Sequence, residues 1–306
     1  MAFLPHAQRW RALAVLLAWL LFPSWSGALQ TATGHAELRP QMDDARKEYE
    51  ESLKTFRELA RKDPETYLPD VAMTLNNLGI LDSAQDRMKE ARKEYEESLK
   101  IYRKLAQKDP EAYLPNVAAT LNNLGVLDRD KNRMEEALKT YGELAQKDPE
   151  TYLPYVAITR NNLGNLNSDP NLIEDGRKEY EEALKIYREL AWKNPETYLA
   201  DVAMILNNLG ILDVAQNRMK EARIEYEEAL KTFGELAQKD PKTYLPDVAM
   251  VLNNLGILDR DQNRMAEARK EYEEALKIYE AFAKQDPEQF RADVKRLKKL
   301  LKELPK

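Results

Sequence analysis

The sequence of 306 residues contains no cysteine and only two histidines, His6 and His35. The absence of cysteine excludes disulfides, thiolate nucleophiles and cysteine-ligated zinc or iron–sulfur sites. Both histidines precede the repeated part of the chain, so histidine triads and histidine metal sites are not expected within it. We therefore predict a protein that has no metal or cofactor and is not an enzyme, since only carboxylates remain to support catalysis.

An excess of basic residues is also lacking: 47 lysines and arginines stand against 53 aspartates and glutamates, a net charge of −6. The two signs are interspersed along the chain, so nucleic acid and anionic lipid are not expected as partners. Alanine, glutamate, lysine, leucine and arginine dominate the composition. Because these residues are strong helix formers and β-branched runs are few, we predict an all-α protein.

The first 28 residues have the pattern of an export signal. Arg9 and Arg11 precede an uncharged apolar run over residues 12–22, and small residues occupy positions 26–28. A helix of this length rises ~16 Å, about half of the hydrocarbon thickness of a bilayer. We predict a signal peptide over 1–28 that is cleaved near Ala28 and gives a periplasmic or secreted protein, with an uncleaved membrane anchor as the alternative. Residues 29–40 are polar and are predicted to form a flexible linker.

One phrase recurs along the rest of the chain. Tyr-Leu-Pro-Asp-Val-Ala, followed by Leu-Asn-Asn-Leu-Gly, begins at Tyr67 and returns in close variants at Tyr113, Tyr152, Tyr198 and Tyr244. The starts are 46 residues apart, except for 39 between Tyr113 and Tyr152. A fixed period in this range predicts a solenoid, in which each unit buries its apolar face against its neighbours. Five near-copies of one surface favour extended binding over catalysis, which needs a single site.

Each unit is predicted to form two helices. In the first unit Val71, Leu75 and Leu78 form one apolar stripe on a helix predicted to start at Pro69, and an amphipathic helix follows a turn at 82–86. The Asp-Pro-Glu-x-Tyr segment before this proline is either a separate turn or the first turn of a longer, bent helix. We predict a solenoid over 41–306, composed of a half repeat at 41–63, repeats that begin at 67, 113, 152, 198 and 244, and a capping helix at 287–304.

Two units depart from the pattern. The second lacks seven residues (39 rather than 46), which we place within its second helix, so that Ala137 and Tyr141 keep the inward positions. Seven residues are close to two helical turns, and their loss rotates the following residues by only ~20°. In the third unit Gly176 replaces an alanine, Leu172 replaces an arginine, and a proline stiffens the turn. We expect a looser helix pair in this third unit.

A further signature links the two helices of a unit: Leu78-Gly79 on the first precedes Ala91 and Tyr95 on the second. A small residue on each helix lets the pair approach closely, and the aromatic ring fills the gap. With its copies around Gly125, Gly210 and Gly256, this signature resembles the tetratricopeptide repeat family, in particular the long repeats of the kinesin-light-chain type, over residues 41 to about 294. The resemblance implies a right-handed α-solenoid of stacked helix-turn-helix repeats, whose first helices line a concave groove that binds peptides.

In that family an asparagine three residues before the glycine hydrogen-bonds the backbone of a bound peptide. The resemblance therefore implies five groove asparagines: Asn76, Asn122, Asn161, Asn207 and Asn253. Apolar residues near them would form the groove walls: Met73, Ile80, Val126, Ile158, Met204, Ile211, Met250 and Ile257. A side-chain amide both donates and accepts, so a row of amides satisfies an extended peptide without reading its sequence. Alternatively these asparagines satisfy polar groups between helices, as we expect for the asparagine that follows each of them.

The pattern as a whole predicts an exported scaffold that binds a protein or peptide partner and has no membrane contact beyond its export signal. A structural spacer, or a self-assembling element without a ligand, is the second interpretation. The third is a carboxylate-based glycan hydrolase, which needs one asymmetric pair of acids in a cleft. The acids of this chain instead recur in every unit, which argues against that third interpretation.

Overall fold

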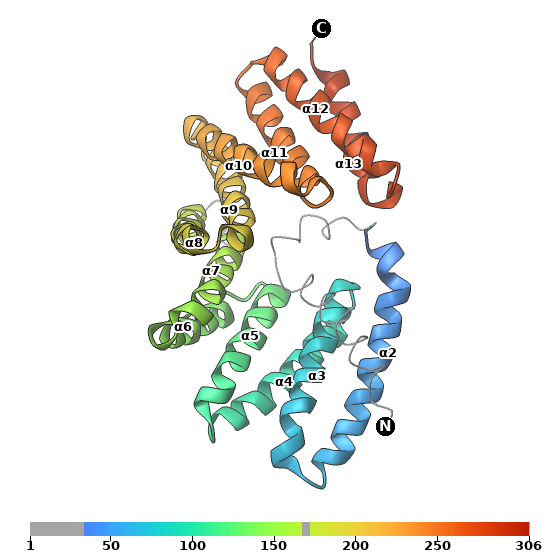
Figure 1. The fold of residues 1–306 in the computed structure, drawn as a ribbon, viewed down its shortest axis with the longest axis vertical. Helices are drawn as coiled ribbons and strands as arrows, with labels where there is room; N and C mark the ends of the chain where they lie inside the picture. The colour runs from blue at the N-terminus through green and yellow to red at the C-terminus, as the bar shows by residue number, and fades with distance from the viewer. Residues whose placement is uncertain (1–33, 167–171, 306) are drawn as a thin grey trace. The chain divides into compact units, whose positions relative to one another are not determined.

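The computed structural model describes residues 34–166 and 172–305, and all regular secondary structure in these residues is helical (Figure 1). The all-α solenoid class predicted from the sequence is confirmed. In chain order the helices are α2 (Gly34–Ala60), α3 (Pro64–Ala84), α4 (Met88–Ala106), α5 (Pro110–Asp128), α6 (Lys131–Lys147), α7 (Pro149–Leu166), α8 (Ile173–Lys193), α9 (Pro195–Ala215), α10 (Met219–Lys239), α11 (Pro241–Asp261), α12 (Met265–Ala283) and α13 (Pro287–Glu303).

The predicted signal peptide over 1–28 lies outside the described residues, and so does the start of the predicted linker, 29–33. Residues 34–40, which we expected to belong to the linker, form the first turns of α2 instead. The half repeat predicted at 41–63 therefore sits on a longer helix that ends at Ala60.

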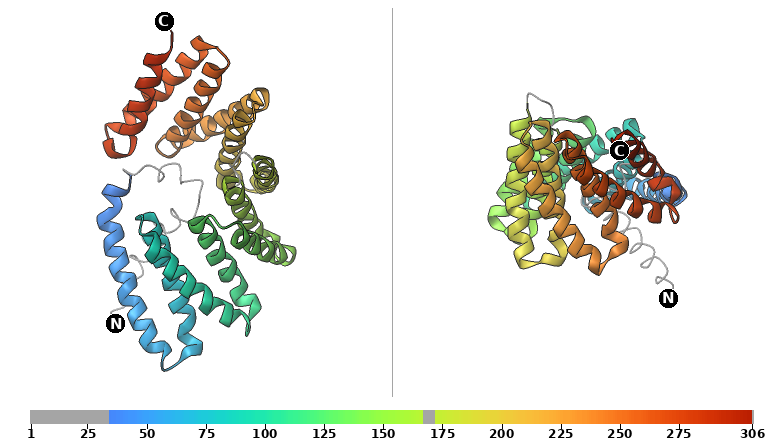
Figure 2. Two further views of the ribbon diagram at one scale, coloured as in Figure 1. Left: turned by 180° about the vertical axis from the view of Figure 1, so that it is seen from behind. Right: turned by 90° about the horizontal axis from the view of Figure 1, so that it is seen from above.

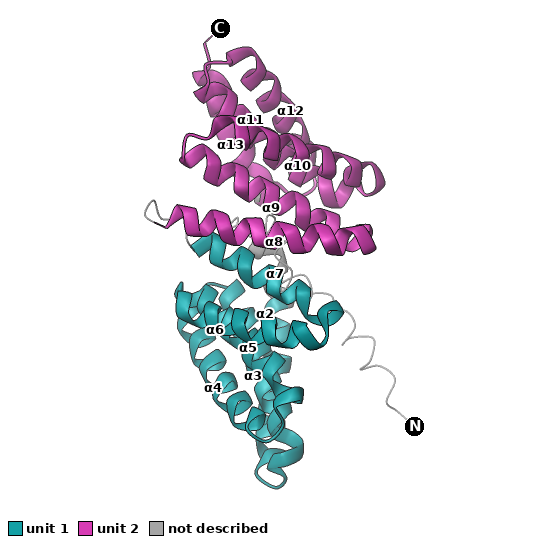
Figure 3. Cartoon of the chain, turned by 90° about the vertical axis from the view of Figure 1, so that its left-hand side faces the viewer, with its two compact units in different colours: residues 1–26, 35–166 teal, residues 27–34, 167–306 magenta. Residues whose placement is uncertain are grey.

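The chain divides into two compact units, whose described parts are residues 35–166 and 172–305 (Figure 3). The division falls between α7 and α8, within the third repeat, where a looser helix pair is expected from Gly176 and Leu172. The structure adds a further departure in this repeat. Arg160 on α7 takes the place that Leu75 and Leu121 hold on α3 and α5, and both leucines are 1% exposed. A guanidinium at a core position weakens apolar packing, because the charge resists burial.

Within each unit the helices stack in two layers (Figure 2). We call the first helices of the repeats, α3, α5, α7, α9 and α11, the A helices, and α2, α4, α6, α8, α10 and α12 the B helices. Successive A helices of one unit contact one another. Successive B helices are joined by ion pairs between long side chains on the surface. Examples are Arg57–Glu97 and Arg188–Glu228, both at 2.6 Å. The A helices therefore form the more closely packed layer.

The A helices begin one turn earlier than the sequence pattern predicts. Asp63 caps α3 by accepting from the backbone N–H of Thr66 at 3.3 Å, and Pro64 occupies the first turn. Pro69 then lies inside the helix, so placing the helix start at Pro69 was wrong. The Asp-Pro-Glu-x-Tyr segment is the first turn of one long helix, which settles the alternative left open above. A proline inside a helix removes one backbone hydrogen bond, and Ala200 at the same position of α9 shows that the helix forms without the proline.

The predicted glycine–tyrosine contact holds α3, α9 and α11 close to the B helix that follows each of them. A Cβ atom on Gly79 would lie 2.7 Å from the ring of Tyr95, and one on Gly210 would lie 2.5 Å from the ring of Tyr226. Gly256 and Tyr272 repeat the contact at 2.5 Å. Only a residue without a side chain fits there, because carbon atoms at these distances would overlap.

The shortened second repeat solves the same packing problem differently. A Cβ on Gly125 would meet Met134 at 2.5 Å, so Met134 and not Tyr141 takes the place of Tyr95. The Tyr141 hydroxyl donates to the Pro115 carbonyl at 3.4 Å, as that of Tyr279 does to Pro246. The missing residues thus come from the turn and the start of the B helix, so matching Tyr141 to Tyr95 was wrong. The prediction that Ala137 and Tyr141 keep inward positions is confirmed, since both are buried. Arg129 adopts a left-handed conformation in this turn, with a φ of 52°, as Asp86, Asn217 and Asn263 do in the turns of other repeats.

An aspartate at the end of α3, α5, α9 and α11 receives an arginine from the B helix of the preceding repeat. The Arg46 side chain donates to both carboxylate oxygens of Asp82, at 2.7 and 3.1 Å, and Asp82 is fully buried. Arg177 binds Asp213 in the same way, at 3.0 and 3.4 Å. We call this contact, which spans 36 residues each time, the arginine clamp. It recurs at Arg92–Asp128 and Arg223–Asp259, and at the chain's end Arg269 donates instead to the carbonyls of Leu304 and Pro305.

A glutamate accompanies the clamp aspartate in three repeats. Burial beside Asp82 raises the pKa of Glu94 to about 8, and the same surroundings raise the pKa of Glu225 and of Glu271 to about 8. A protonated carboxyl can donate to the neighbouring carboxylate, which removes the repulsion between them. Glu94 directly precedes Tyr95 in the sequence. In the shortened repeat Arg133 directly precedes Met134, the counterpart of Tyr95, so Arg133 occupies the position of the glutamate and lies 3.1 Å from Asp128.

We expect Gly210→Ala to destabilise the protein by roughly 1–3 kcal/mol, because the added methyl group must displace the Tyr226 ring. Gly234 on α10 provides the matched control, since a Cβ there would meet nothing within 4 Å. Gly234→Ala is expected to stabilise by roughly 0.5–1 kcal/mol through helix propensity. Urea denaturation measures both, and equal effects of the two changes would contradict the close-packing account.

The raised pKa values of the three glutamates predict a stability that falls with rising pH. Each glutamate holds its proton in the folded protein until about pH 8 but loses it near pH 4.5 when unfolded. The folded state therefore binds more protons between these values, so the free energy of unfolding decreases from about pH 4.5 to 8.

The triple variant Glu94→Gln, Glu225→Gln, Glu271→Gln is expected to flatten this slope, because a neutral amide donates to the aspartate at every pH. The gain at pH 8 is expected to be roughly 1 kcal/mol per site, discounted for partial exposure. Changing the exposed Glu51, Glu182 and Glu273 to glutamine is the control. A slope that both variants share with the parent protein would refute the shared-proton arrangement.

Candidate functional site

One stripe of side chains runs along the outward side of every A helix. On α9 it consists of Met204, Asn208 and Ile211, at spacings of four and three residues, which place them on one face of a helix. We call this set and its counterparts on the other A helices the A-helix stripe: Met73, Asn77 and Ile80 on α3; Ala119, Asn123 and Val126 on α5; Ile158, Asn162 and Asn165 on α7; Met250, Asn254 and Ile257 on α11.

The apolar members of the stripe differ in exposure. Met73, Val126 and Ile211 are each 49% exposed. Ile80 is buried, at 7%. The remaining predicted groove-wall residues are half-buried: Ile158, Met204, Met250 and Ile257. Both units therefore present at least one large apolar side chain to solvent from this stripe.

The asparagines of neighbouring A helices form hydrogen bonds with each other. Asn123 on α5 donates its Nδ2 to Oδ1 of Asn76 on α3 at 3.3 Å. Asn162 donates to Asn122 at 3.1 Å, and Asn254 donates to Asn207 at 2.8 Å. In each case the second asparagine of one repeat donates to the first asparagine of the preceding repeat. We call this series the asparagine ladder, and it joins the A helices within each unit.

The ladder changes which asparagines face solvent. Of the five groove asparagines implied by the resemblance, Asn76 and Asn122 are half-buried, while Asn161, Asn207 and Asn253 are only 6%, 2% and 2% exposed. The second asparagines, which we expected to be structural, do bond between helices, and they are also half-buried on the A-helix stripe. The sequence analysis did not predict that these second asparagines are accessible. Each precedes the next stripe residue by three positions, as Asn208 precedes Ile211, and this spacing could have placed them on the stripe.

The last rung of the ladder is incomplete. Asn253 Oδ1 is buried and has no hydrogen-bond partner among the described residues. The residue 46 positions after Asn254 is Leu300 on the capping helix, which cannot donate a side-chain hydrogen bond. The cap therefore ends the ladder by replacing its donor with an apolar side chain.

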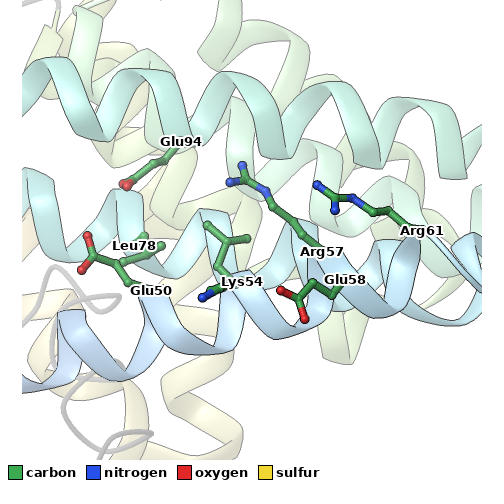
Figure 4. Close-up of a pocket in the computed structure, with 8 residues that line it drawn as sticks. Glu50, Lys54, Arg57, Glu58, Arg61, Leu78 and Glu94 are labelled. Carbon is green, nitrogen blue, oxygen red and sulfur yellow. The ribbon is translucent and has the colours of Figure 1, made fainter.

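A hollow on the B-helix side of α2, α3 and α4 contains acidic and basic side chains (Figure 4). Leu53 and Leu78 are among its lining residues, and one of its arginines, Arg57, already pairs with Glu97 on α4. The remaining lining residues are Glu50, Lys54, Glu58, Arg61 and Glu94. Glu94 beside Asp82 is the kind of acid pair that a hydrolase would need. The same pair recurs as Glu225–Asp213 and Glu271–Asp259, so it belongs to the repeat interface and not to one asymmetric cleft.

One described helix, α9, is long and apolar enough to cross a membrane. Half of its most apolar stretch is buried within the protein, with residues such as Val202, Leu206 and Leu209 in the core. The apolar character of α9 is therefore explained by its packing against α8 and α10.

Comparison with known proteins gives one family match. The model of the tetratricopeptide repeat matches residues 38–104 and 201–281. No curated protein sequence matches the chain. Among solved structures, BtubC (BKLC) from P. vanneervenii is similar in fold, with 23% identity, a TM-score of 0.59, and coverage of 79% of this chain and 92% of that one. The apo form of the quorum sensor NprR from B. thuringiensis has 16% identity, a TM-score of 0.55, and coverage of 97% and 76%.

The ladder predicts an energetic coupling between its asparagines. Asn207→Ala and Asn254→Ala are each expected to destabilise the protein, and together less than additively, with a coupling energy of about 0.5–1.5 kcal/mol. A double-mutant cycle by urea denaturation measures this coupling. The control cycle pairs Asn207 with the exposed Asn132 of the other unit, for which we expect additivity. Additivity in both cycles would mean that the Asn254–Asn207 hydrogen bond contributes nothing to stability.

Proposed function

The chain belongs to the tetratricopeptide repeat family, and from this premise we propose that it is an exported scaffold that binds an extended peptide or protein segment along the A-helix stripe. The observation that carries the proposal is the half-exposure of Met73, Val126 and Ile211 on that stripe. Single exposed apolar residues are ordinary on protein surfaces. Met73 and Val126, however, occupy the same face of neighbouring A helices in one unit, and Ile211 occupies the position equivalent to Val126 in the other, which suits a ligand that runs across the repeats of a unit.

The asparagine ladder supports a role for amides in such binding. Asn76 and Asn122 are half-buried, and their carbonyl oxygens already accept from the next repeat. The ladder thereby fixes the orientation of each amide, and its Nδ2 group becomes the donor offered to a ligand. An extended peptide presents backbone carbonyls at regular intervals, which are the matching acceptors. The half-buried methionines beside them adapt to side chains of different shapes.

Export is the part of the proposal that rests on the sequence alone. The basic residues before an eleven-residue apolar run, and the small residues that follow, are the features of a cleavable signal. A scaffold without cysteine needs no disulfide formation after export.

The proposal is tested by changing the exposed stripe residues without touching the core. The stripe variant carries Met73→Gln, Val126→Gln and Ile211→Gln. The control variant carries Met88→Gln, Ile224→Gln and Trp192→Gln on the B helices, where these side chains are 45%, 65% and 87% exposed. Both variants are expected to unfold within about 0.5 kcal/mol of the parent protein, since exposed substitutions have small effects. Each protein is immobilised and exposed to native extract, and retained proteins are quantified by mass spectrometry.

We expect partners that the parent and the control variant retain equally, and that the stripe variant retains at least tenfold less. Partners lost only by the control variant would place binding on the B helices and contradict the proposal. Retention of the chain itself as the main protein would favour the self-assembling alternative.

A further inference from the structure

The first and last described helices each lack a partner that inner helices have. α2 is a B helix with no described A helix before it, and α13 has the position of an A helix with no described B helix after it (Figure 1). Inside the units an A helix packs against the B helix that follows it, as α3 does with α4 and α11 with α12. α13 and α2 therefore correspond to the two halves of one repeat.

Apolar positions on both end helices are less covered than their equivalents inside. Leu301 on α13 is half-buried, whereas the equivalent leucines of the other A helices are at most 2% exposed. Phe56 on α2 is half-buried, whereas the equivalent aromatic residues of the other B helices are at most 5% exposed. In an inner repeat this aromatic residue contacts the A helix before it, since Tyr141 donates to the carbonyl of Pro115. The position of Pro115 on α13 is occupied by Ala292, which is exposed.

Basic residues occupy the side of α13 on which another A helix would pack against its B helix. Gly79 on α3 lies against Tyr95 of α4, and the equivalent position on α13 is Lys302. The spacings of Lys302 and three further exposed basic residues are four, three and four, which place them on one face of the helix. We call this set the basic row: Arg291, Lys295, Lys298 and Lys302. Lys298 also pairs with Glu280 of α12 at 2.7 Å.

Acidic residues line an exposed side of α2. Glu51 is equivalent to Glu97 and Glu228, each of which pairs with an arginine from the preceding B helix. Glu51 therefore marks the side of α2 that a preceding repeat would cover. With three further exposed acids, at spacings of four, three and seven residues, it forms what we call the acidic row: Asp44, Glu48, Glu51 and Glu58. Lys47 lies beside this row and pairs with Asp44 at 3.5 Å.

The contacts of an inner repeat align the two rows. The two helices of a repeat run in opposite directions: Gly79 meets Tyr95, and the earlier Ala72 accepts from the later Ser98. The same alignment of α13 with α2 would bring Lys302 to Tyr49, the equivalent of Tyr95. Three opposite charges then come together along the two helices: Lys302 with Glu48, Lys298 with Glu51, and Arg291 with Glu58.

We propose that α13 of one copy of this chain takes α2 of a second copy as its B helix, so that copies stack end to end through the basic and acidic rows. Lys302 at the position of Gly79 prevents an approach as close as that of an inner repeat, so the association rests mainly on charge. Exposed ion pairs are individually weak and are screened by salt. The contact joins two different surfaces, so a further copy can add at each free end, which gives chains or rings of copies. This stacking goes beyond the proposed function and does not use the A-helix stripe.

Sedimentation velocity of the purified protein tests the stacking. At about 50 mM NaCl we expect the average mass to rise with concentration over roughly 1–200 µM protein, the range of weak interfaces. At about 500 mM NaCl the association constant should fall at least tenfold, because the Debye length is then only ~4 Å.

Two charge-reversal variants identify the surfaces. The α13 variant carries Arg291→Glu, Lys295→Glu and Lys302→Glu. The α2 variant carries Glu48→Lys, Glu51→Lys and Glu58→Lys. Each variant has the same sign of charge on both rows and should remain monomeric at the highest concentration. An equimolar mixture of the two should associate again, because each row then finds the opposite charge on the other variant.

Two matched controls carry the same changes of net charge on inner B helices. Their exposed positions are Lys139→Glu, Lys185→Glu and Lys231→Glu in one, and Glu143→Lys, Glu182→Lys and Glu273→Lys in the other. Both controls should associate as the parent protein does. The stripe variant should also associate, because the A-helix stripe lies outside the contact.

A parent protein that remains monomeric over the whole concentration range at low salt would overturn the stacking. Association that persists in the α2 or the α13 variant alone would overturn it as well. Circular dichroism establishes that both variants are folded, and a mixture of folded variants that stays monomeric would likewise refute the pairing of the two rows. Loss of association in each variant, retention in the controls and recovery in the mixture would establish it.

Discussion

The arginine clamp is the contact on which the stacking of repeats depends. A fully buried carboxylate is strongly unfavourable without a counter-ion, and breaking such a pair by removing one partner typically destabilises a protein by about 3–5 kcal/mol. Asp82 and Asp213 are fully buried, and each is bound by an arginine from the preceding repeat and by a second arginine, Arg87 or Arg218, from its own repeat. The clamp therefore fixes where α3, α5, α9 and α11 end relative to the B helix before each of them. The asparagine ladder and the A-helix stripe both depend on that register, because they need equivalent positions of neighbouring helices to meet.

The two layers divide the chemistry of the protein. The buried charged groups lie where B helices meet the ends of A helices, around residues such as Asp82 and Glu94. The ion pairs and shared protons are found there too. The stripe along the A helices instead presents amides and apolar side chains such as Asn123 and Val126. A surface of this kind can satisfy a peptide backbone without a strong demand on its sequence. Selectivity must then come from positions where a repeat departs from the others.

The departures also show how the repeat tolerates change. The second repeat lost seven residues, and Met134 moved into the place of a tyrosine ring while Arg133 replaced a protonated glutamate. The third repeat carries Arg160 at a core position, and the division between the two compact units falls within it. The ends differ as well, since the capping helix offers Leu300 in place of a ladder asparagine. In each case one helix changed and its immediate neighbour compensated or lost a contact, as expected of a chain in which repeats touch only their neighbours.

The sequence by itself determined the class of fold, the number and order of helices in the repeats, and the glycine–tyrosine packing, because these follow from periodicity and from local sterics. It also placed the candidate site on the A helices through a family resemblance. Only the tertiary structure decided that Pro69 lies inside a helix, that Met134 and not Tyr141 faces Gly125, and that Asn207 is buried while Asn208 is accessible. These outcomes depend on how closely two helices approach and on side chains that stand 36 to 47 residues away in the sequence. No local pattern encodes such distances, so the pairing of Asn254 with Asn207 became visible only once the helices were stacked.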